Sequence, residues 1–589
     1  MEVSEHPEAQ QLHDEKTGNR TTAANSGEDE GKSSTIHAEE HEAIRGDESD
    51  GRVEWSALQI LATLSLCALY AGSQLPLLFG SGSVSFMVED IGGSTISTWV
   101  PVSYSLAFAS INPFGGYLQD VFGRRNISIT GGLLLCIGLI VVATSHGIAQ
   151  AIVGMTICGC GAGIGELTAL AGISEIVPVK QRGFYLGAVT ASILPFAPYP
   201  IYTTELGTHA TWRWCFWIPL IWNALAVVGI ALTYWPHSQL RKERKSAREV
   251  LPLIDYVGAF LSTGGLTMFL VAVTAGGYTA PWKSARVLCP LVIGILLIVV
   301  FVLWEWKFAK LPMVPRELFA GQRVVGMSFL ISFIAGIYFY AILNFTPILY
   351  LDIYNPGPIK AGGKGVIIIL GVFAGAVFPN MLISTFKSRT REILLFCAIC
   401  ATAFGTAIVT ATPANPVQTI ALCTLAGFGV GSLVACAVTT SVIATPDNLI
   451  STTVALCLSI RTVGGSVGTA INSNVFGTKL AKRLPQDVAK YAVKAGLPAS
   501  SANTFVELFL TGPNNITQAR VPGVNAEVLL AAEHGSRWAY AWSLKYVWYT
   551  MMPFGVLSCL ACLALGNVGK FMTNRVAANI GRGKTSTTH

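Results

Sequence analysis

The sequence has few charged residues for its length. Of its 589 residues only 12% are Asp, Glu, Lys or Arg, while 52% are hydrophobic; soluble globular proteins carry about 25% charged residues. The shortage is uneven, because residues 1–50 alone hold 14 acidic and 4 basic residues. Most of the remaining chain must face lipid, and this composition excludes an ordinary soluble enzyme.

Other absences narrow the function further. The sequence has no GxxxxGK[ST] nucleotide-binding pattern, which argues against an ATP-driven pump. Nearly all histidines lie in the acidic tail or in predicted loops, and no repeated channel filter is visible, so neither a membrane enzyme nor a channel is favoured. The 13 cysteines fall within apolar runs, where cysteine behaves as a small hydrophobe. We expect no enzymatic activity, no cofactor, no metal site and no nucleic-acid partner.

Residues 1–50 differ from the rest. They are rich in Glu, Asp, Ser, Thr and Gly, a composition that cannot build a hydrophobic core and predicts a disordered acidic tail. A basic segment followed by an apolar run is missing, so the tail is not a signal peptide.

Long apolar runs dominate the remaining sequence. A helix needs roughly 20 mostly apolar residues to cross the hydrocarbon layer. Runs of this kind predict an all-α polytopic membrane protein with fourteen spans, near residues 56–79, 97–119, 127–145, 148–172, 183–203, 214–235, 255–275, 285–306, 323–345, 363–384, 392–411, 416–440, 450–475 and 541–564.

The basic residues of the short loops predict the orientation. If both termini are cytoplasmic, the inner loops hold 16 Lys and Arg and the short outer loops hold 5. Because cytoplasmic loops carry the excess of positive charge, we expect this orientation. The segment 477–540 then lies outside, where its Asn515-Ile516-Thr517 matches the glycosylation pattern.

The loop after the second predicted span carries an ordered motif. Gly116, Asp120, Gly123, Arg124 and Arg125 follow one another in the spacing of the loop between spans two and three of the major facilitator superfamily, which the sequence resembles. The resemblance implies that Glu175, at the end of span four, pairs with these arginines and forms an inner gate with the loop. An ordinary surface salt bridge is the alternative for Glu175.

The resemblance also implies a division of the chain. The expected parts are a cytoplasmic tail (1–50), a six-helix half (51–235), a linker with spans seven and eight (236–322), a second six-helix half that includes the outer segment 477–540 (323–569), and a second cytoplasmic tail (570–589).

Two charged residues lie deep within predicted spans. Arg461 lies eleven residues from the inner end of span thirteen, about 16 Å deep, and Glu166 is the deep acid of span four. Intramembrane charges are rare and usually functional, so both are candidates for proton coupling, with a structural ion pair as an equal alternative. Met155 stands where many superfamily members have an arginine linked to proton transfer, so coupling cannot be transferred to that position.

Polar and aromatic side chains on spans one, five and nine are candidates for contact with cargo. Aromatic residues at helical spacing in a membrane helix more often pack within the protein, and this alternative stays open. The candidates are Tyr70, Gln74, Phe196, Tyr199, Phe333, Tyr340 and Asn344.

Fourteen spans with a two-span insert resemble the fourteen-span drug:proton antiporter branch of the superfamily. The strings Ile173–Pro178, Trp212–Trp217 and Leu311–Phe319 resemble its fungal trichothecene-efflux-pump type. The resemblance implies a monomeric carrier that exports a small hydrophobic compound, such as a mycotoxin or drug, in exchange for protons. The expected location is the cell membrane, with a vacuolar or vesicle membrane as the alternative. A siderophore-iron importer of the same superfamily and a non-transporting membrane sensor are the alternatives.

Overall fold

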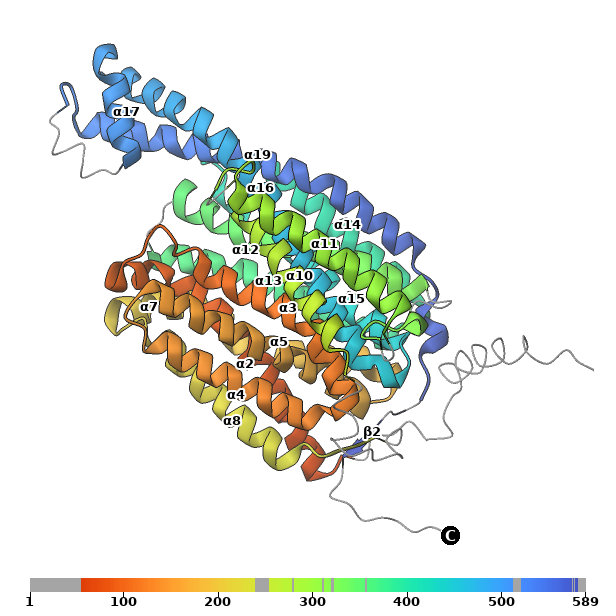
Figure 1. The fold of residues 1–589 in the computed structure, drawn as a ribbon. Coiled ribbons are helices and arrows are strands. Elements are labelled where there is room, and N and C mark those ends of the chain that lie inside the picture. The colour runs from red at the N-terminus through yellow and green to blue at the C-terminus, as the bar shows by residue number, and fades with distance from the viewer. Residues whose placement is uncertain are drawn as a thin grey trace, which may run out of the picture.

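A computed structural model describes residues 55–238, 254–277, 280–309, 312–318, 323–354, 358–511, 521–574, 576 and 578–580. The acidic tail 1–50 and the glycosylation pattern at Asn515 lie outside these residues. Long helices that run side by side form the molecule (Figure 1). We call the end of the bundle that carries Gly123 the inner end, following the predicted orientation, and the opposite end the outer end.

The first half of the bundle comprises the helices from α2 to α8. Its α-helices are α2 (Ala57–Ile91), α3 (Trp99–Phe122), α4 (Arg124–Ala143), α5 (Ile148–Ile176), α6 (Arg182–Ala191), α7 (Tyr199–His209) and α8 (Trp214–Thr233).

The second half follows a two-helix insert. The insert consists of α10 (Tyr256–Ala275) and α11 (Ala285–Lys307). The second half contains α12 (Arg323–Ile348), α13 (Pro358–Thr385), α14 (Thr390–Ala407), α15 (Pro416–Ile443), α16 (Ile450–Lys494), α17 (Ala502–Thr511) and α19 (Ala526–Ala564). Two three-residue strands, β1 (Pro236–Ser238) and β2 (Ala578–Ile580), pair antiparallel at the inner end.

The all-α membrane fold is confirmed, with one difference in the count of spans. Thirteen helical segments of the described chain are long and apolar enough to cross a membrane, whereas fourteen spans were predicted. The predicted span 97–119 forms α3, a 24-residue helix that packs against α5 and α16 inside the bundle. Its buried Ser103, Ser110, Asn112 and Gln119 explain its lower hydropathy, since polar side chains in membrane helices face the protein interior.

The fifth predicted span is broken where its prolines lie. Helix α6 ends at Ala191, a 3-10 turn covers Leu194–Phe196, and α7 begins at Tyr199. Proline removes a backbone donor and clashes with the preceding turn, so Pro195 and Pro198 prevent a continuous helix. Ile193 and Tyr199, on either side of the break, line a central cavity.

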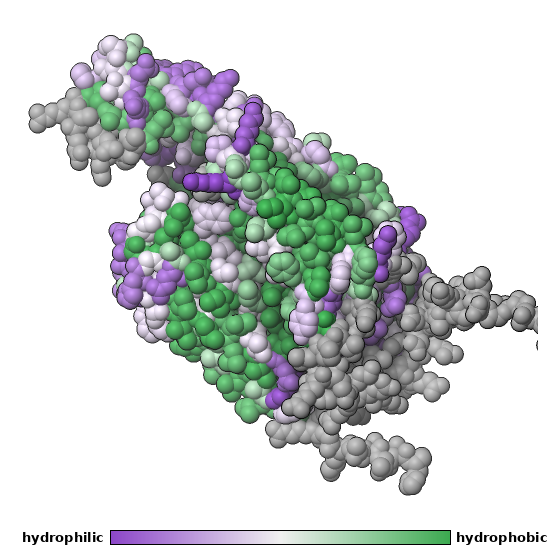
Figure 2. All heavy atoms as spheres, viewed as in Figure 1, coloured by the Kyte–Doolittle hydropathy of each residue, from purple (hydrophilic) through white to green (hydrophobic). Residues whose placement is uncertain are grey.

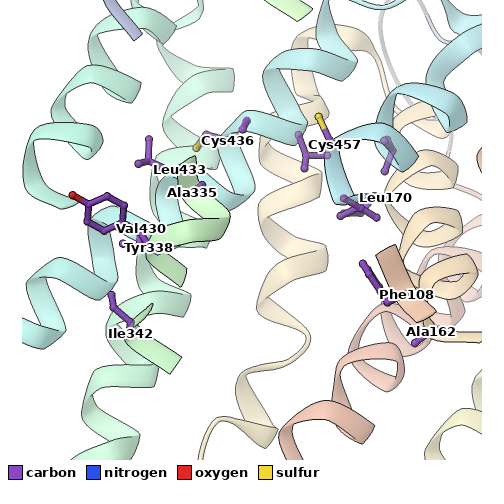
Figure 3. Packing of buried hydrophobic residues seen from close by; sticks show 14 of the residues in the cluster. Phe108, Ala162, Leu170, Ala335, Tyr338, Ile342, Val430, Leu433, Cys436 and Cys457 are labelled. Carbon is purple, nitrogen blue, oxygen red and sulfur yellow. The ribbon is translucent and has the colours of Figure 1, made fainter. Parts of the chain in front are cut away.

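Small residues set the closest helix contacts. The Cβ of an alanine at Gly138 would lie 2.5 Å from the backbone nitrogen of Cys158, and at Gly154 it would lie 2.9 Å from that of Val142. Lipid gives helices no hydrophobic reason to associate, so close backbone approach supplies the packing energy. Figure 3 shows the buried side chains of both halves, with Phe108 and Ala162 from the first and Val430 and Leu433 from the second.

The insert lies on one side of the bundle. Helix α10 packs against α3 of the first half and α16 of the second, and α11 packs against α10. Most of α11 is exposed, for example Val292 at 61% and Leu296 at 59%. Hydrophobic side chains form the middle of the visible face in Figure 2, and hydrophilic side chains gather towards its ends. This distribution suits a protein that crosses a bilayer.

Residues 477–511 and 521–540 form an arm of helices beyond the outer end (Figure 1). Helix α16 continues to Lys494, α17 follows, and α19 returns towards the bundle. Val488, Ala492, Phe505 and Val528 form a separate hydrophobic core in the arm. Because this core can form without lipid, the arm can stay ordered in water.

The orientation is testable at exposed positions of the arm and of the inner loops. We expect a cysteine at Leu530, which is 66% exposed in the arm, to react with a membrane-impermeant thiol reagent in intact cells. A cysteine at Arg389, whose side chain is 70% exposed at the inner end, should react only after permeabilisation. The reverse pattern would contradict the predicted topology.

Candidate functional site

A cavity lies between the two halves. Its inner chamber has a volume of about 150 Å³, and its outer chamber has a volume of about 560 Å³. Tyr199, Tyr340 and Tyr350 line both chambers, so the two chambers are adjacent and the larger one lies towards the outer end. The volume and the largely apolar lining suit a small organic molecule.

A buried ion pair crosses the inner chamber. Arg461 Nη2 of α16 lies 3.2 Å from Glu166 Oε1 of α5, so the two deep charges predicted from the sequence meet across the halves. The Nε2 of Gln74 on α2 donates to the second oxygen of Glu166 at 2.5 Å. The Glu166 side chain is 1% exposed and that of Arg461 is 14% exposed. Each charge therefore depends on the other, because an unpaired charge at this depth is costly.

The aromatic neighbours of the pair come from both halves. Tyr70 and Tyr104 of the first half and Tyr340 of the second line the inner chamber with Glu166 and Arg461. The hydroxyl of Tyr104 donates to the carbonyl of Ser73, which fixes its ring between α3 and α2. The pair is thus held in a largely aromatic environment, where screening by water is weak.

The motif loop joins the halves at the inner end. The carboxylate of Asp120 accepts hydrogen bonds from the backbone nitrogen of Thr452 at 2.9 Å and from its hydroxyl at 2.8 Å. These groups lie in the first turn of α16, which has no side-chain cap of its own. Asp120 therefore caps a helix of the other half, where a negative charge also interacts favourably with the helix dipole.

Arg124 is the centre of the ion-pair cluster at the inner end, which is the predicted inner gate. Its Nη1 forms an ion pair with Glu175, its Nη2 lies 3.8 Å from Asp120, and its Nε donates to Ser451 of α16 at 2.8 Å. Burial of the guanidinium is thus matched by two carboxylates and a hydroxyl. The predicted pairing of Glu175 with the motif arginine is present in the structure.

The remaining motif residues shape the loop. Gly123 has a φ of +91° between α3 and α4, which a side chain would strain. At Gly116 a Cβ would lie 2.6 Å from that of Ala455, so glycine allows α3 to touch α16. Arg125 does not join the gate, because it donates to the carbonyl of Ala231 and its guanidinium lies 3.6 Å above the ring of Trp235.

The inner gate contains a second ion pair, between Arg182 and Asp447, which the sequence analysis did not predict. The fully buried Arg182 at the start of α6 donates to the carboxylate of Asp447 at 3.1 Å and to the carbonyl of Val442 at 2.9 Å. It also donates to the carbonyl of Ser174 in the first half. The orientation count treated Arg182 as one of 16 loop cations, and no local signal distinguishes it from an exposed loop arginine.

Glycines close the other inner seam between the halves. At Gly183 and Gly187 of α6 a Cβ would crowd Asn380, Ser384 and Val377 of α13. The hydroxyl of Ser384 accepts a hydrogen bond from the backbone nitrogen of Phe184 at 2.9 Å. The two glycines are four residues apart, which places them on one face of the helix. This spacing is visible in the sequence and could have predicted the close contact.

Five of the seven candidate cargo residues line the cavity. Tyr70, Gln74, Tyr199 and Tyr340 line the inner chamber, and Asn344 lines the outer one together with Tyr199 and Tyr340.

The other two candidate cargo residues lie elsewhere. Phe196 packs edge-on against Trp222 with ring centroids 5.0 Å apart, and Phe333 packs against the core. Helical periodicity gives the spacing of such side chains, but it cannot tell which face of the helix meets the other half.

Two helical halves, a cavity between them and ion pairs that close one end define a membrane carrier of the alternating-access type. The fold agrees with a solved structure of the human organic anion transporter MFSD10, with a TM-score of 0.51 over 87% of this chain and 100% of that one at 13% identity.

The model of the fungal trichothecene efflux pump family matches residues 51–588, and the chain belongs to this family of major facilitator transporters. It is similar to the efflux pump dotC of Dothistroma septosporum, with 31% identity over 54% of each chain. It is also similar to the trichothecene efflux pump TRI12 of Fusarium sporotrichioides, with 26% identity over 83% of each chain. The match to dotC therefore spans about half the length of that relative.

The gate contacts give a testable consequence. We expect Asp120→Asn to reduce transport about tenfold, because loss of one interaction between the halves shifts a two-state equilibrium by roughly 1–3 kcal/mol. Transport of a trichothecene probe in membrane vesicles, normalised to the amount of protein, measures the effect.

Asp90→Asn is the matched control for this substitution. Asp90 pairs with Arg213 at 2.7 Å, but both residues belong to the first half, so the variant should transport normally. A wild-type rate for Asp120→Asn would show that the gate contacts do not control access.

Proposed function

We propose that the chain is a secondary active transporter of the cell membrane that exports a small, largely hydrophobic compound in exchange for protons. The observation that carries the proposal is the cavity between the halves, which contains an ion pair from both halves and whose inner end is closed by the gate. Family membership supports efflux as the direction.

The cavity lining supports the class of cargo. Leucine, isoleucine, tyrosine and phenylalanine side chains make up much of the inner chamber, for example Leu170, Ile193, Phe339 and Phe373. Such a surface binds apolar ring systems, while a few polar groups fix their orientation. A mycotoxin or similar compound fits this description, and the printed name of the Fusarium relative, a trichothecene efflux pump, supports it.

Glu166 is the proposed proton site. In this conformation the inner gate is closed, and Glu166 lines the inner chamber, which adjoins the larger outer chamber. A proton that binds Glu166 removes its charge and thereby weakens its attraction to Arg461. The halves can then separate at this level, and release of the proton on the inner side restores the pair for the next cycle.

The ion pair also links the proton to the cargo. A proton and a hydrogen-bond donor of the cargo both need a carboxylate oxygen of Glu166, so the two compete for this side chain. Proton binding in one conformation and cargo binding in the other give the exchange of one for the other. We propose that a single chain carries out the whole cycle, because both halves of the site belong to it.

Transport in inside-out vesicles tests the function. An acidic lumen should drive accumulation of a radiolabelled trichothecene, and dissipation of the pH gradient should abolish it. A ferric hydroxamate complex serves as the probe for the importer alternative. Accumulation of that complex in right-side-out vesicles, without movement of the trichothecene, would contradict export. Failure of the chain to move any solute would instead favour the sensor alternative.

A substitution at Glu166 tests the coupling. We expect Glu166→Gln to lose gradient-driven accumulation and to retain exchange of labelled for unlabelled cargo, since a neutral amide keeps the shape of the protonated acid. Glu205→Gln is the matched control, because Glu205 pairs with His209 and has a side chain that is 45% exposed. Full gradient-driven accumulation by Glu166→Gln would place the proton site elsewhere.

A further inference from the structure

The position of the two-helix insert indicates a role in transport. We propose that α10 forms part of the wall of the cargo pathway, in the gap between α3 and α16, and that Thr274 contacts the cargo. This inference rests on the proposed function, because it takes the central cavity as the pathway.

The first observation is that one residue of the insert lines the cavity. Thr274 of α10 borders the outer chamber together with Pro101 and Ser105 of α3 and with Ser466 and Thr469 of α16. A residue on a peripheral helix can reach this space only where α3 and α16 leave an opening. Helix α10 therefore closes an opening between the two halves.

The second observation is the change along the seam between α3 and α16. Towards the inner end the two helices touch directly, since Gly116 lies against Ser451 and Ala455. In the middle, the hydroxyl of Ser459 donates to the carbonyl of Ala109 at 2.7 Å. Beyond this level Leu270 of α10 packs in one cluster with residues of both helices.

The third observation is a contact built for the outer end of α10. Asn474 of α16 donates to the carbonyl of Gly276 at 3.3 Å and accepts from the indole nitrogen of Trp282 at 3.2 Å. Gly277 has a φ of +76°, and a Cβ at this position would overlap the side chain of Asn474. Gly277 thus lets the end of α10 approach the amide of Asn474, and Gly276 leaves room for the ring of Trp282.

The insert is attached more extensively to the first half. The hydroxyl of Thr267 donates to that of Ser110 at 3.0 Å, and Ala259 and Met313 pack around Tyr117 at the inner end. Because α10 contacts α3 at the middle and inner levels as well, it should stay with the first half when the halves move. The contacts of α10 with α16, among them the contact with Asn474, must then change during the cycle.

One face of α10 meets the pathway and the other meets lipid. Thr267, Leu270 and Thr274 follow at spacings of three and four residues, which places them on one side of the helix. Met268 lies on another side and is 43% exposed. A wall helix requires this division, whereas a helix that only packs against the bundle needs no side chain that water in the cavity can reach.

Thiol accessibility tests the wall directly. In a full-length chain whose native cysteines are replaced, Thr274→Cys should react with a membrane-impermeant thiol reagent about tenfold faster than Met268→Cys, because the thiolate forms in contact with water. A trichothecene probe should slow the reaction at Thr274→Cys and leave Met268→Cys unchanged. Equal rates at the two positions would overturn the proposal.

A lipid-borne quencher tests the closure. A fluorophore on Thr274→Cys should be insensitive to spin-labelled lipid in the otherwise unchanged chain and should become quenched after Asn474→Ala. Asn472→Ala is the matched control, because Asn472 lies on the same helix but bonds to Thr550 and Met551. Quenching before any substitution at Asn474 would show that α10 does not close the gap.

The two proposals fail separately in these experiments. If Thr274→Cys reacts with the impermeant reagent but the chain transports no cargo, export is refuted and the wall proposal remains supported. If the chain transports cargo but Thr274→Cys does not react with the impermeant reagent, the wall proposal is refuted and export remains supported.

Discussion

The need to pair buried charges within the membrane organises this protein. Glu166 and Arg461 cannot lie at their depth alone, because a charge without a partner in low dielectric is costly. They come from different halves and are held 3.2 Å apart, so the arrangement of the halves and the charge of one carboxylate are linked. The same two helices also form the inner gate. Helix α5 provides Glu175, and α16 provides Ser451 and Thr452.

The inner gate contains the same kind of constraint. Arg124 and Arg182 are both buried, and each contacts the second half. The gate therefore cannot open until these donors exchange their partners for water or for other protein groups. Glycines at Gly116 and Gly183 bring the helix backbones close enough for the charged contacts to form. Packing and electrostatics thus favour the same closed inner end, while the outer chamber remains about 560 Å³ in volume.

Sequence reasoning recovered the parts of this arrangement that depend on local patterns. Apolar runs located the helices, although α2, α16 and α19 extend 12 to 19 residues beyond the predicted spans. The motif spacing identified Asp120 and Arg124. Pro195 and Pro198 account for the break between α6 and α7. Contacts between distant segments were harder: Arg182 and Asp447 are 265 residues apart, and neither is unusual in its own loop. The faces of Phe196 and Phe333 also depended on how the halves pack, and α3 fell below the hydropathy of a typical span because its polar face is buried in the protein.

The central claim is that the two ends of the bundle open in alternation under the control of Glu166. Spin labels at the exposed positions Asn126 and Arg389 of the inner end, and at Thr208 and Val417 of the outer end, allow both distances to be measured by pulsed electron paramagnetic resonance. The account predicts that Glu166→Gln, which mimics the protonated state, lengthens the inner distance and shortens the outer one. Two distances that stay fixed, or that change in the same direction, would contradict it.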